Sequence, residues 1–289
     1  MSQFPLVSPQ WLKGRLDDPK TVVLDATYHL PNVNRDAKAE FLAEHIPGAR
    51  FFDIDGVKDK TDPLPHMVPS PEDFAKVAAG LGISNDSHVV CYDAYGLFSA
   101  ARPWWMFRLF GHDSVSVLDG GLPAWKAAGL PVDSGAPAPV TAGRFEASFR
   151  PELIRRLADV TANLTSKQDT ILDARSAGRF DGTAPEPRPE LRGGHIPGSL
   201  NLPFSDLVDP DTKRVKDIHA LESSFRKAGI KLGRDKVVAS CGSGVTACVL
   251  ALGLSLLGDD TAAVYDGSWS EWGSRPDTPI DNPNGKQHP

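Results

Sequence analysis

The sequence is poor in cysteine and in long apolar runs. Its 289 residues include three cysteines, too few for a disulfide framework in a chain of this length. The longest apolar stretch, 245–257, is interrupted by Gly253 and Ser255 and is shorter than the roughly 18 apolar residues of a membrane span. The first residues, MSQFPLVSPQWLKGRL, lack the basic and apolar segments of a secretory signal. We therefore expect a cytoplasmic protein with no membrane association.

Excess positive charge and cofactor motifs are also lacking. The formal net charge is -6 at pH 7, which argues against nucleic-acid binding, because phosphate backbones require a basic surface. The cysteines and histidines show none of the paired spacings of zinc ligands. Neither GxGxxG nor GxxxxGK[ST] occurs. We expect no metal, nucleotide or organic cofactor, and any anionic substrate must be held by a local group of basic side chains.

What the sequence does contain is an internal repeat. Four segments of the first half recur in the second half, in the same order and at offsets of 147 to 150 residues. The pairs are VVLDAT (22–27) with TILDAR (170–175), EHIPGA (44–49) with GHIPGS (194–199), HVVCYDAYG (88–96) with KVVASCGSG (236–244), and LDGGLPAW (118–125) with YDGSWSEW (265–272). A nearly constant offset of this kind indicates a duplicated domain.

Each half alternates short Val, Ile and Leu runs with longer helical patterns. The expected strands are 21–25, 88–92, 114–118, 169–173, 236–240 and 262–265, and the expected helices include 71–81, 103–110 and 245–257. Such alternation predicts an α/β fold with a mainly parallel sheet flanked by helices in each half. The segment 131–145, rich in Pro, Ala and Gly, is typical of a linker, so we predict two domains, 1–138 and 139–289.

Cys241 is the strongest candidate for a functional residue. It follows an apolar strand and begins the loop CGSGVT, 241–246, after which a helix is expected. Glycines allow several backbone N–H groups to converge on one point, and the helix directs its positive end to the same place. Thiolates at helix N-termini have pKa values lowered to roughly 3.5 to 7.5, which makes them nucleophilic at neutral pH. We therefore expect Cys241 to be an exposed nucleophile at the start of this loop.

The other two cysteines have neighbours that favour packing. Cys91 lies inside an apolar strand, and Cys248 lies seven residues after Cys241, in the first turn of the expected helix, where a role as a resolving thiol stays open. At the repeat offset of 148 residues, Asp93 occupies the position of Cys241. A carboxylate cannot relay sulfur, so we expect the first half to be non-catalytic and to contribute a wall of the site.

Together these features resemble the tandem rhodanese-like sulfurtransferases. HIPG in each half, the CGSGVT loop and YDGSWSEW look like a 3-mercaptopyruvate sulfurtransferase, and the resemblance covers almost the whole chain. Thiosulfate-using rhodaneses carry basic residues after the cysteine, where this chain has Gly242 and Ser243. The resemblance therefore implies 3-mercaptopyruvate as the sulfur donor, with thiosulfate:cyanide sulfurtransferase activity as the alternative.

The resemblance also implies a mechanism. Cys241 would attack the sulfur of 3-mercaptopyruvate, release pyruvate and form a persulfide, which a thiol such as thioredoxin, or cyanide, then removes in ping-pong chemistry. By position, Arg179 and Arg188 correspond to the arginines that bind the substrate carboxylate and keto group, a task suited to the planar guanidinium. Taken without the family, either arginine could be a surface charge. The loop residues expected around the substrate are Gly242, Gly244, Val245 and Thr246.

Three further residues match a proton relay proposed for the family. They are Asp55 and His66, in the segment FFDIDGVKDKTDPLPHM, and Ser243 of the loop. Lone His and Asp residues in a polar segment are as often structural, so both interpretations stay open. His45 and His195 precede Ile-Pro-Gly in both halves, and we expect them to fix turns.

Two other classes of function are less consistent with the loop. Dual-specificity phosphatases share a related fold but use a Cys-x5-Arg loop, whereas the residue six after Cys241 is Ala247. A non-catalytic binding module would not need the intact thiol loop. A monomer is the default expectation for the oligomeric state.

Overall fold

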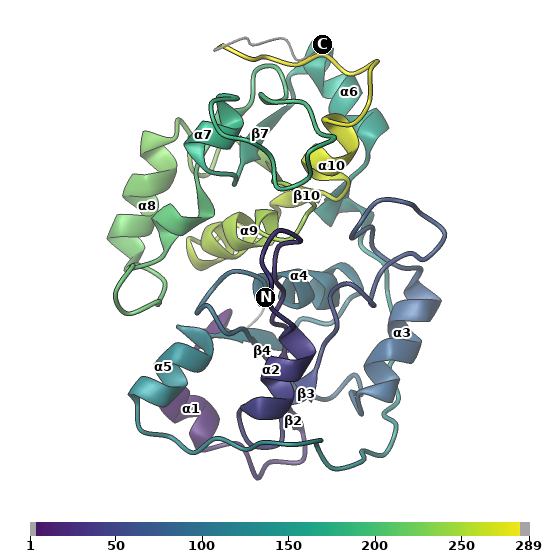
Figure 1. The fold of residues 1–289 in the computed structure, drawn as a ribbon, viewed down its shortest axis with the longest axis vertical. Helices are drawn as coiled ribbons and strands as arrows, with labels where there is room; N and C mark the ends of the chain where they lie inside the picture. Colours follow the sequence, from purple (N-terminus) through teal and green to yellow (C-terminus); the bar gives the residue numbers. More distant parts are fainter. Residues whose placement is uncertain (1–3, 284–289) are drawn as a thin grey trace.

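Two five-stranded sheets, one in each half of the chain, form the framework of the computed structural model, which describes residues 4–283 (Figure 1). The first sheet has the strand order β1-β5-β4-β2-β3 and the second β6-β10-β9-β7-β8. All pairings within them are parallel. The strands are β1 (Leu6–Val7), β2 (Thr21–Asp25), β3 (Arg50–Phe51), β4 (His88–Tyr92), β5 (Val115–Leu118), β6 (Ile154–Arg155), β7 (Asp169–Asp173), β8 (Leu200–Asn201), β9 (Lys236–Ser240) and β10 (Ala263–Tyr265). The two orders are identical when each strand is replaced by its counterpart, so the repeat in the sequence is a repeat of topology.

Helices flank both sheets, which confirms the predicted α/β fold. They are α1 (Pro9–Lys13), α2 (Ala37–Ala43), α3 (Pro71–Gly80), α4 (Ala101–Leu109), α5 (Gly121–Ala127), α6 (Leu157–Ser166), α7 (Ala177–Phe180), α8 (Ile218–Lys227), α9 (Ala247–Leu256) and α10 (Ser268–Trp272), with 3₁₀ turns at Pro151–Leu153 and Phe204–Leu207. The start of α3 shows the local cause: the Ser70 hydroxyl accepts the N–H of Asp73 at 3.1 Å, and Pro71 occupies the first turn. Among residues 4–283, no helix is long and apolar enough to cross a membrane.

The central strands lie where the sequence predicts them, but the edge strands were missed. β2, β4, β7 and β9 match the predicted ranges, because β-branched runs buried on both faces are typical of parallel sheets. β1, β3, β6 and β8 have two residues each, too few to show a pattern in the sequence.

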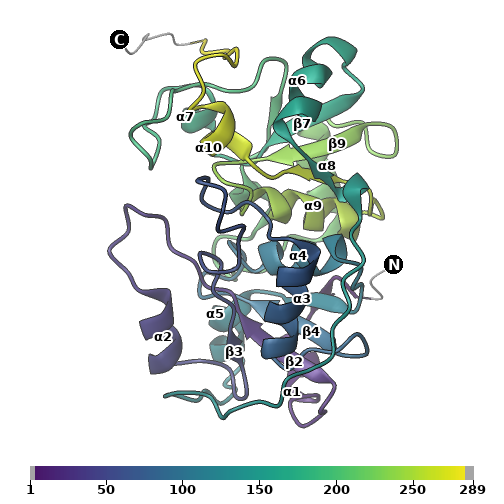
Figure 2. The ribbon, with the colours of Figure 1, turned by 90° about the vertical axis from the view of Figure 1, so that its right-hand side faces the viewer.

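Helices α4 and α9 lie between the two sheets and join the halves (Figure 2). All residues of α4 are buried, as are residues 247–255 of α9, which is typical of helices inside a core. A single apolar cluster includes Trp104 and Phe107 of the first half and Leu250 and Leu254 of the second. The junction between the halves is therefore a continuous core.

The predicted linker, 131–145, contains no helix or strand. It runs along the first half, where the Gly143 N–H donates to Ala79 O at 2.8 Å and Phe145 packs against Phe74 and Phe107. Beyond it, the Ser148 N–H donates to Phe110 O at 2.8 Å. These contacts attach the linker to the first half, and the division of the chain at residue 138 stays a prediction.

Candidate functional site

The loop 241–246 connects the end of β9 to the start of α9, at the junction between the two halves. The start of α10 holds it in place. The Cys241 N–H donates to Ser268 Oγ at 3.1 Å, and the Trp269 N–H donates to Cys241 O at 2.9 Å. Both the N–H and the hydroxyl of Ser270 donate to Gly242 O, at 2.8 and 2.7 Å. The chain that follows β10 thus fixes the backbone that carries the thiol.

The loop leaves backbone donors free for an anion. Within residues 4–283, the N–H groups of residues 242–246 have no hydrogen-bond acceptor. Gly244 adopts φ +76°, and a Cβ there would lie 2.8 Å from Asp266 O, so this turn requires glycine. Gly242 and Thr246 are partly exposed, whereas Gly244 and Val245 are buried. That these four residues surround the substrate stays a prediction.

The first half shows what the same loop geometry can hold. The carboxylate of Asp93, at the position of Cys241, accepts hydrogen bonds from four backbone N–H groups of its own loop at 2.8 to 2.9 Å. These donors are Tyr95, Phe98, Ser99 and Ala100. An internal carboxylate fills the first cradle, and Cys241 occupies the corresponding position of the repeat in the second half.

The expectation that Cys241 is exposed was wrong. The residue is 2% exposed and belongs to the apolar cluster that spans the two halves, together with Tyr28. Packing of the first half against the loop buries it, an effect that does not depend on neighbours in the sequence. Cys91 and Cys248 are fully buried. Burial raises the pKa of both thiols, that of Cys248 to about 12, and the Cys248 thiol donates to Gly244 O at 3.2 Å.

The structure brings Asp55, His66 and Ser243 together across the junction. His66 Nδ1 lies 2.8 Å from Ser243 Oγ, and His66 Nε2 lies 3.1 Å from Asp55 Oδ1. The His66 side chain is 1% exposed, whereas that of Asp55 is 68% exposed. Burial lowers the pKa of His66, an effect opposed by its hydrogen bond with Asp55, and the same bond lowers the pKa of Asp55. A neutral imidazole beside an ionised carboxylate directs Nε2–H at Asp55, leaving Nδ1 to accept the Ser243 hydroxyl.

Sequence reasoning missed a buried ion pair beneath this array. Arg102 of α4 donates to Asp266 Oδ1 at 2.9 Å, to Gly244 O at 3.2 Å and to His66 O. The other carboxylate oxygen, Asp266 Oδ2, accepts the Val68 N–H at 2.8 Å. One guanidinium thus joins the His66 segment of the first half to the cysteine loop of the second. Two features of the sequence could have indicated this ion pair: Arg102 lies in a largely apolar helix, and Asp266 precedes a glycine in the fourth repeated segment.

Arg179 lies directly beside the cysteine loop. A Cβ on Gly242 would be 3.0 Å from Arg179 Nη2, so the missing side chain lets the guanidinium approach the loop. Glu186, which the sequence analysis did not identify as a site residue, accepts two hydrogen bonds from Arg179. Arg179 Nε donates to Glu186 Oε1 at 3.1 Å, and Arg179 Nη2 donates to Glu186 Oε2 at 2.6 Å.

Arg188 acts electrostatically on three residues of the site. Its positive charge lowers the pKa of Asp55 and of His66, although in both cases other neighbours have larger effects. Burial raises the pKa of Tyr28, and the charge of Arg188 partly offsets that rise. Within the described part of the chain, no carboxylate lies within ion-pair distance of Arg188. The Tyr28 ring lies edge-on to His66, with centroids 5.0 Å apart. Tyr28 was not predicted as a site residue, because it is one of several aromatic residues near strand ends.

The two histidines of the HIPG segments have matching structural contacts. The Nδ1 atoms of His45 and His195 lie 2.7 Å from Phe41 O and 2.8 Å from Phe180 O. Both backbone N–H groups donate at 2.9 Å to an aspartate carbonyl of a later segment. These contacts are those expected of turn-fixing residues. Among residues 4–283, no group of three or more His, Cys, Asp or Glu side chains could hold a metal ion.

The geometry is that of a cysteine in an anion cradle on a duplicated parallel-sheet fold. The rhodanese-like domain matches the chain twice, over residues 8–128 and 157–275. The chain therefore belongs to the rhodanese-like domain family and carries two copies of the domain, as the resemblance implied.

Individual relatives are similar over nearly their whole length. The chain is 45% identical to 3-mercaptopyruvate sulfurtransferase of Homo sapiens, covering 98% of this chain and 97% of that protein. It is 44% identical to thiosulfate sulfurtransferase of Mus musculus, covering 92% and 91%. The crystal structure of SseA from Escherichia coli superposes with a TM-score of 0.83 at 40% identity, over 92% of this chain and 99% of that one.

Proposed function

We propose that the protein is a 3-mercaptopyruvate sulfurtransferase in which Cys241 carries the sulfur as a persulfide. The observation that carries the proposal is the array at the junction, where Ser243 of the cysteine loop bonds to His66 and His66 bonds to Asp55. The name of the human relative supports the same activity. The free N–H groups of the loop supply donors for an anionic sulfur.

The choice of donor depends on the loop rather than on overall similarity. Identity to the murine thiosulfate sulfurtransferase is almost the same as identity to the human 3-mercaptopyruvate enzyme. Gly242 leaves the Arg179 guanidinium at the loop, and Arg188 lacks a carboxylate partner in the described residues. Two guanidinium groups suit a substrate with a carboxylate beside a keto group. Thiosulfate as donor is the alternative.

The chemistry follows from the protonation states of the array. The Cys241 thiolate attacks the sulfur of 3-mercaptopyruvate, the sulfur–carbon bond breaks, and its electron pair passes to the enolate of pyruvate. Ser243 and His66 Nδ1 accept the proton of the substrate thiol and return it to the enolate carbon. The products are pyruvate and the persulfide anion of Cys241, so atoms and charge balance. An acceptor thiol then attacks the outer sulfur, leaves as its own persulfide and regenerates the Cys241 thiolate.

The remaining assignments belong to the same proposal. We infer that a protein thiol such as thioredoxin, or cyanide in vitro, accepts the sulfur, and that the enzyme acts as a monomer in the cytoplasm. In this scheme the first half has no nucleophile of its own and contributes Asp55, His66 and Arg102 to the site. The buried Cys248 takes no part in the transfer.

The test measures persulfide formation with 3-mercaptopyruvate, which releases pyruvate, and in parallel with thiosulfate, which releases sulfite. Cys241→Ser is expected to abolish both reactions, and Cys248→Ser serves as the matched control that retains them. A large preference for 3-mercaptopyruvate supports the proposal. A preference for thiosulfate would overturn the assigned donor, and loss of activity in the control would overturn the role of Cys241 as the only transferring thiol.

A further inference from the structure

The first half contains a cavity of about 720 Å³ that the proposed mechanism does not use. It lies between the end of β2 and helices α2 and α5, which occupy the lower part of Figure 1. Its lining includes Asp25, Thr27, Glu40, Glu44 and Leu122. It therefore combines acidic side chains with an apolar wall.

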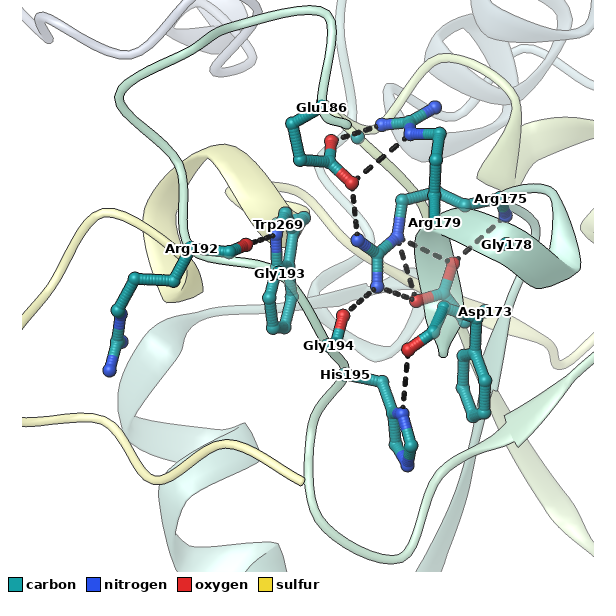
Figure 3. A network of polar contacts seen from close by, with 12 residues as sticks. Asp173, Arg175, Gly178, Arg179, Glu186, Arg192, Gly193, Gly194, His195 and Trp269 are labelled. Atoms are coloured by element: carbon teal, nitrogen blue, oxygen red, sulfur yellow. Dashed lines mark hydrogen bonds and ion pairs between the residues drawn. The ribbon is translucent and has the colours of Figure 1, made fainter. Parts of the chain in front are cut away.

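The second half shows what fills the corresponding place there. The guanidinium of Arg175 bonds to the Asp173 carboxylate, through Nε at 3.0 and 3.1 Å and Nη2 at 2.7 Å (Figure 3). It also donates to Glu186 Oε1 and to Gly194 O, both at 2.8 Å. Its central carbon lies 4.2 Å from the centroid of the Trp269 ring. Two carboxylates, a carbonyl and an apolar ring thus surround one guanidinium.

The repeat relates this arrangement to the cavity position by position. Asp25 corresponds to Asp173 and Thr27 to Arg175, both at an offset of 148 residues. In the EHIPGA and GHIPGS segments Glu44 corresponds to Gly194, and in the fourth repeat Leu122 corresponds to Trp269. All four first-half residues line the cavity, and Glu40 adds the second carboxylate. The first half keeps the surroundings of the guanidinium but has a threonine where the arginine would be.

The charges in the cavity leave one carboxylate without a cation. Asp25 is 2% exposed, and its Oδ1 accepts the N–H and hydroxyl of Thr27 at 2.9 and 2.5 Å. Within residues 4–283 it forms no ion pair, and burial raises its pKa. The two cations of the lining are already paired, Arg35 with Glu40 at 2.6 Å and Lys126 with Glu44 at 2.6 Å. A single incoming cation would complete the charge balance.

We propose that this cavity is a binding site for a guanidinium group, which enters from outside and takes the place that Arg175 occupies in the second half. The group is the side chain of an arginine, either in a protein segment or as the free amino acid. The carboxylates of Glu40 and Glu44, which also line the cavity, disfavour the α-carboxylate of free arginine, so a peptide-bound arginine fits better. The proposal is independent of sulfur transfer, because the cavity does not contain Cys241.

Calorimetric titration of the full-length protein tests the proposal with N-acetyl-L-arginine amide as the probe. N-acetyl-L-lysine amide is the control for charge alone and is expected to bind at least about tenfold more weakly, because an ammonium lacks the planar set of donors. Free L-arginine distinguishes the two sources of the group: weaker binding than the amide indicates an arginine in a protein, and equal binding indicates the free amino acid.

Three variants connect binding to the cavity. Asp25→Asn is expected to weaken binding about tenfold or more, since a hydrogen-bonded charge pair is lost. Thr27→Arg should abolish binding by supplying an internal guanidinium, and Leu122→Trp should strengthen it by restoring the ring found at Trp269. Far-UV circular dichroism verifies the fold of each variant.

Two results would overturn the proposal. One is the absence of saturable binding of the arginine amide up to about 10 mM, the limit of weak specific affinity. The other is binding of the arginine amide that is unchanged in both Thr27→Arg and Leu122→Trp, because the amide would then bind elsewhere on the protein. This second result does not depend on whether Asp25→Asn folds.

Discussion

Replacing Arg102 by methionine is expected to destabilise the protein by about 3 kcal/mol or more, because it leaves a buried carboxylate without its main partner. The side chains of Arg102 and Asp266 are 2% and 0% exposed, and they lie 2.9 Å apart. Methionine keeps the apolar stem of the arginine in α4 but removes all of its donors. The substitution therefore isolates the electrostatic contribution of the ion pair at the junction between the halves.

The magnitude follows from what Asp266 retains. Removing one partner of a buried ion pair costs about 3 to 5 kcal/mol. Asp266 keeps the Val68 N–H at 2.8 Å and the half-exposed Arg156 guanidinium at 3.3 Å, which places the cost at the lower end. Loss of the donors to His66 O and Gly244 O adds to it. A cost of 3 kcal/mol corresponds to a fall of about 5 °C in Tm for a chain of this size.

The assay is urea-induced unfolding followed by tryptophan fluorescence and far-UV circular dichroism, for each single variant and the double variant Arg102→Met/Asp266→Asn. The double variant contains no uncompensated buried charge, so it should be at least about 2 kcal/mol more stable than the sum of the single effects predicts. Arg226→Met is the matched control, because Arg226 pairs with Glu222 on the surface of α8, with side chains 58% and 39% exposed. It should change the free energy of unfolding by less than about 0.5 kcal/mol.

Two results would refute this reasoning. A cost below about 1 kcal/mol for Arg102→Met would mean that Asp266 is adequately neutralised without it. Strictly additive effects in the double variant would mean that the two side chains do not stabilise each other, whatever their separation.

Three further predictions follow from the site. Burial lowers the pKa of His66 from 6.5, so at and just below pH 6.5 the folded state binds fewer protons than the unfolded state, and the free energy of unfolding should decrease as pH falls through the folded-state pKa. Denaturant titrations at several pH values should show that His66→Gln reduces the slope of this free energy against pH by up to about 1.4 kcal/mol per pH unit, and an unchanged slope would contradict the assignment. Mass spectrometry after treatment with 3-mercaptopyruvate should locate the added sulfur on Cys241 alone. The Cys248→Ala variant should retain at least about half of kcat, because burial raises the pKa of this thiol to about 12 and its role is packing; a large loss of kcat would indicate a resolving thiol. Gly242→Arg should lower kcat/KM for 3-mercaptopyruvate about tenfold or more and lower kcat/KM for thiosulfate less, because a Cβ at this position would lie 3.0 Å from Arg179 Nη2. An equal loss with both donors in steady-state assays would mean that Gly242 does not determine the choice of donor.

Much of the fold could be predicted from the sequence because its signals are local. The central strands are short β-branched runs, and several helices, among them α3 and α8, begin at a polar cap, so neighbours in the chain determine them. The nearly constant offset of the four repeats then establishes that the topology is duplicated. The same local reasoning identified Cys241, since a strand, a glycine loop and a helix N-terminus adjoin it in the chain.

The rest was decided by how the two halves pack. Three features of the site depend on contacts between the two halves. They are the burial of Cys241, the hydrogen bond between His66 and Ser243, and the ion pair of Arg102 with Asp266. His66 and Ser243 are 177 residues apart, and Arg102 and Asp266 are 164 residues apart. No local period encodes such contacts, because they depend on the docking of α4 against α9 and on the side chains that this docking removes from water. The sequence by itself therefore determined the duplicated fold and singled out Cys241 as the candidate nucleophile, and only the tertiary structure decided which residues surround it.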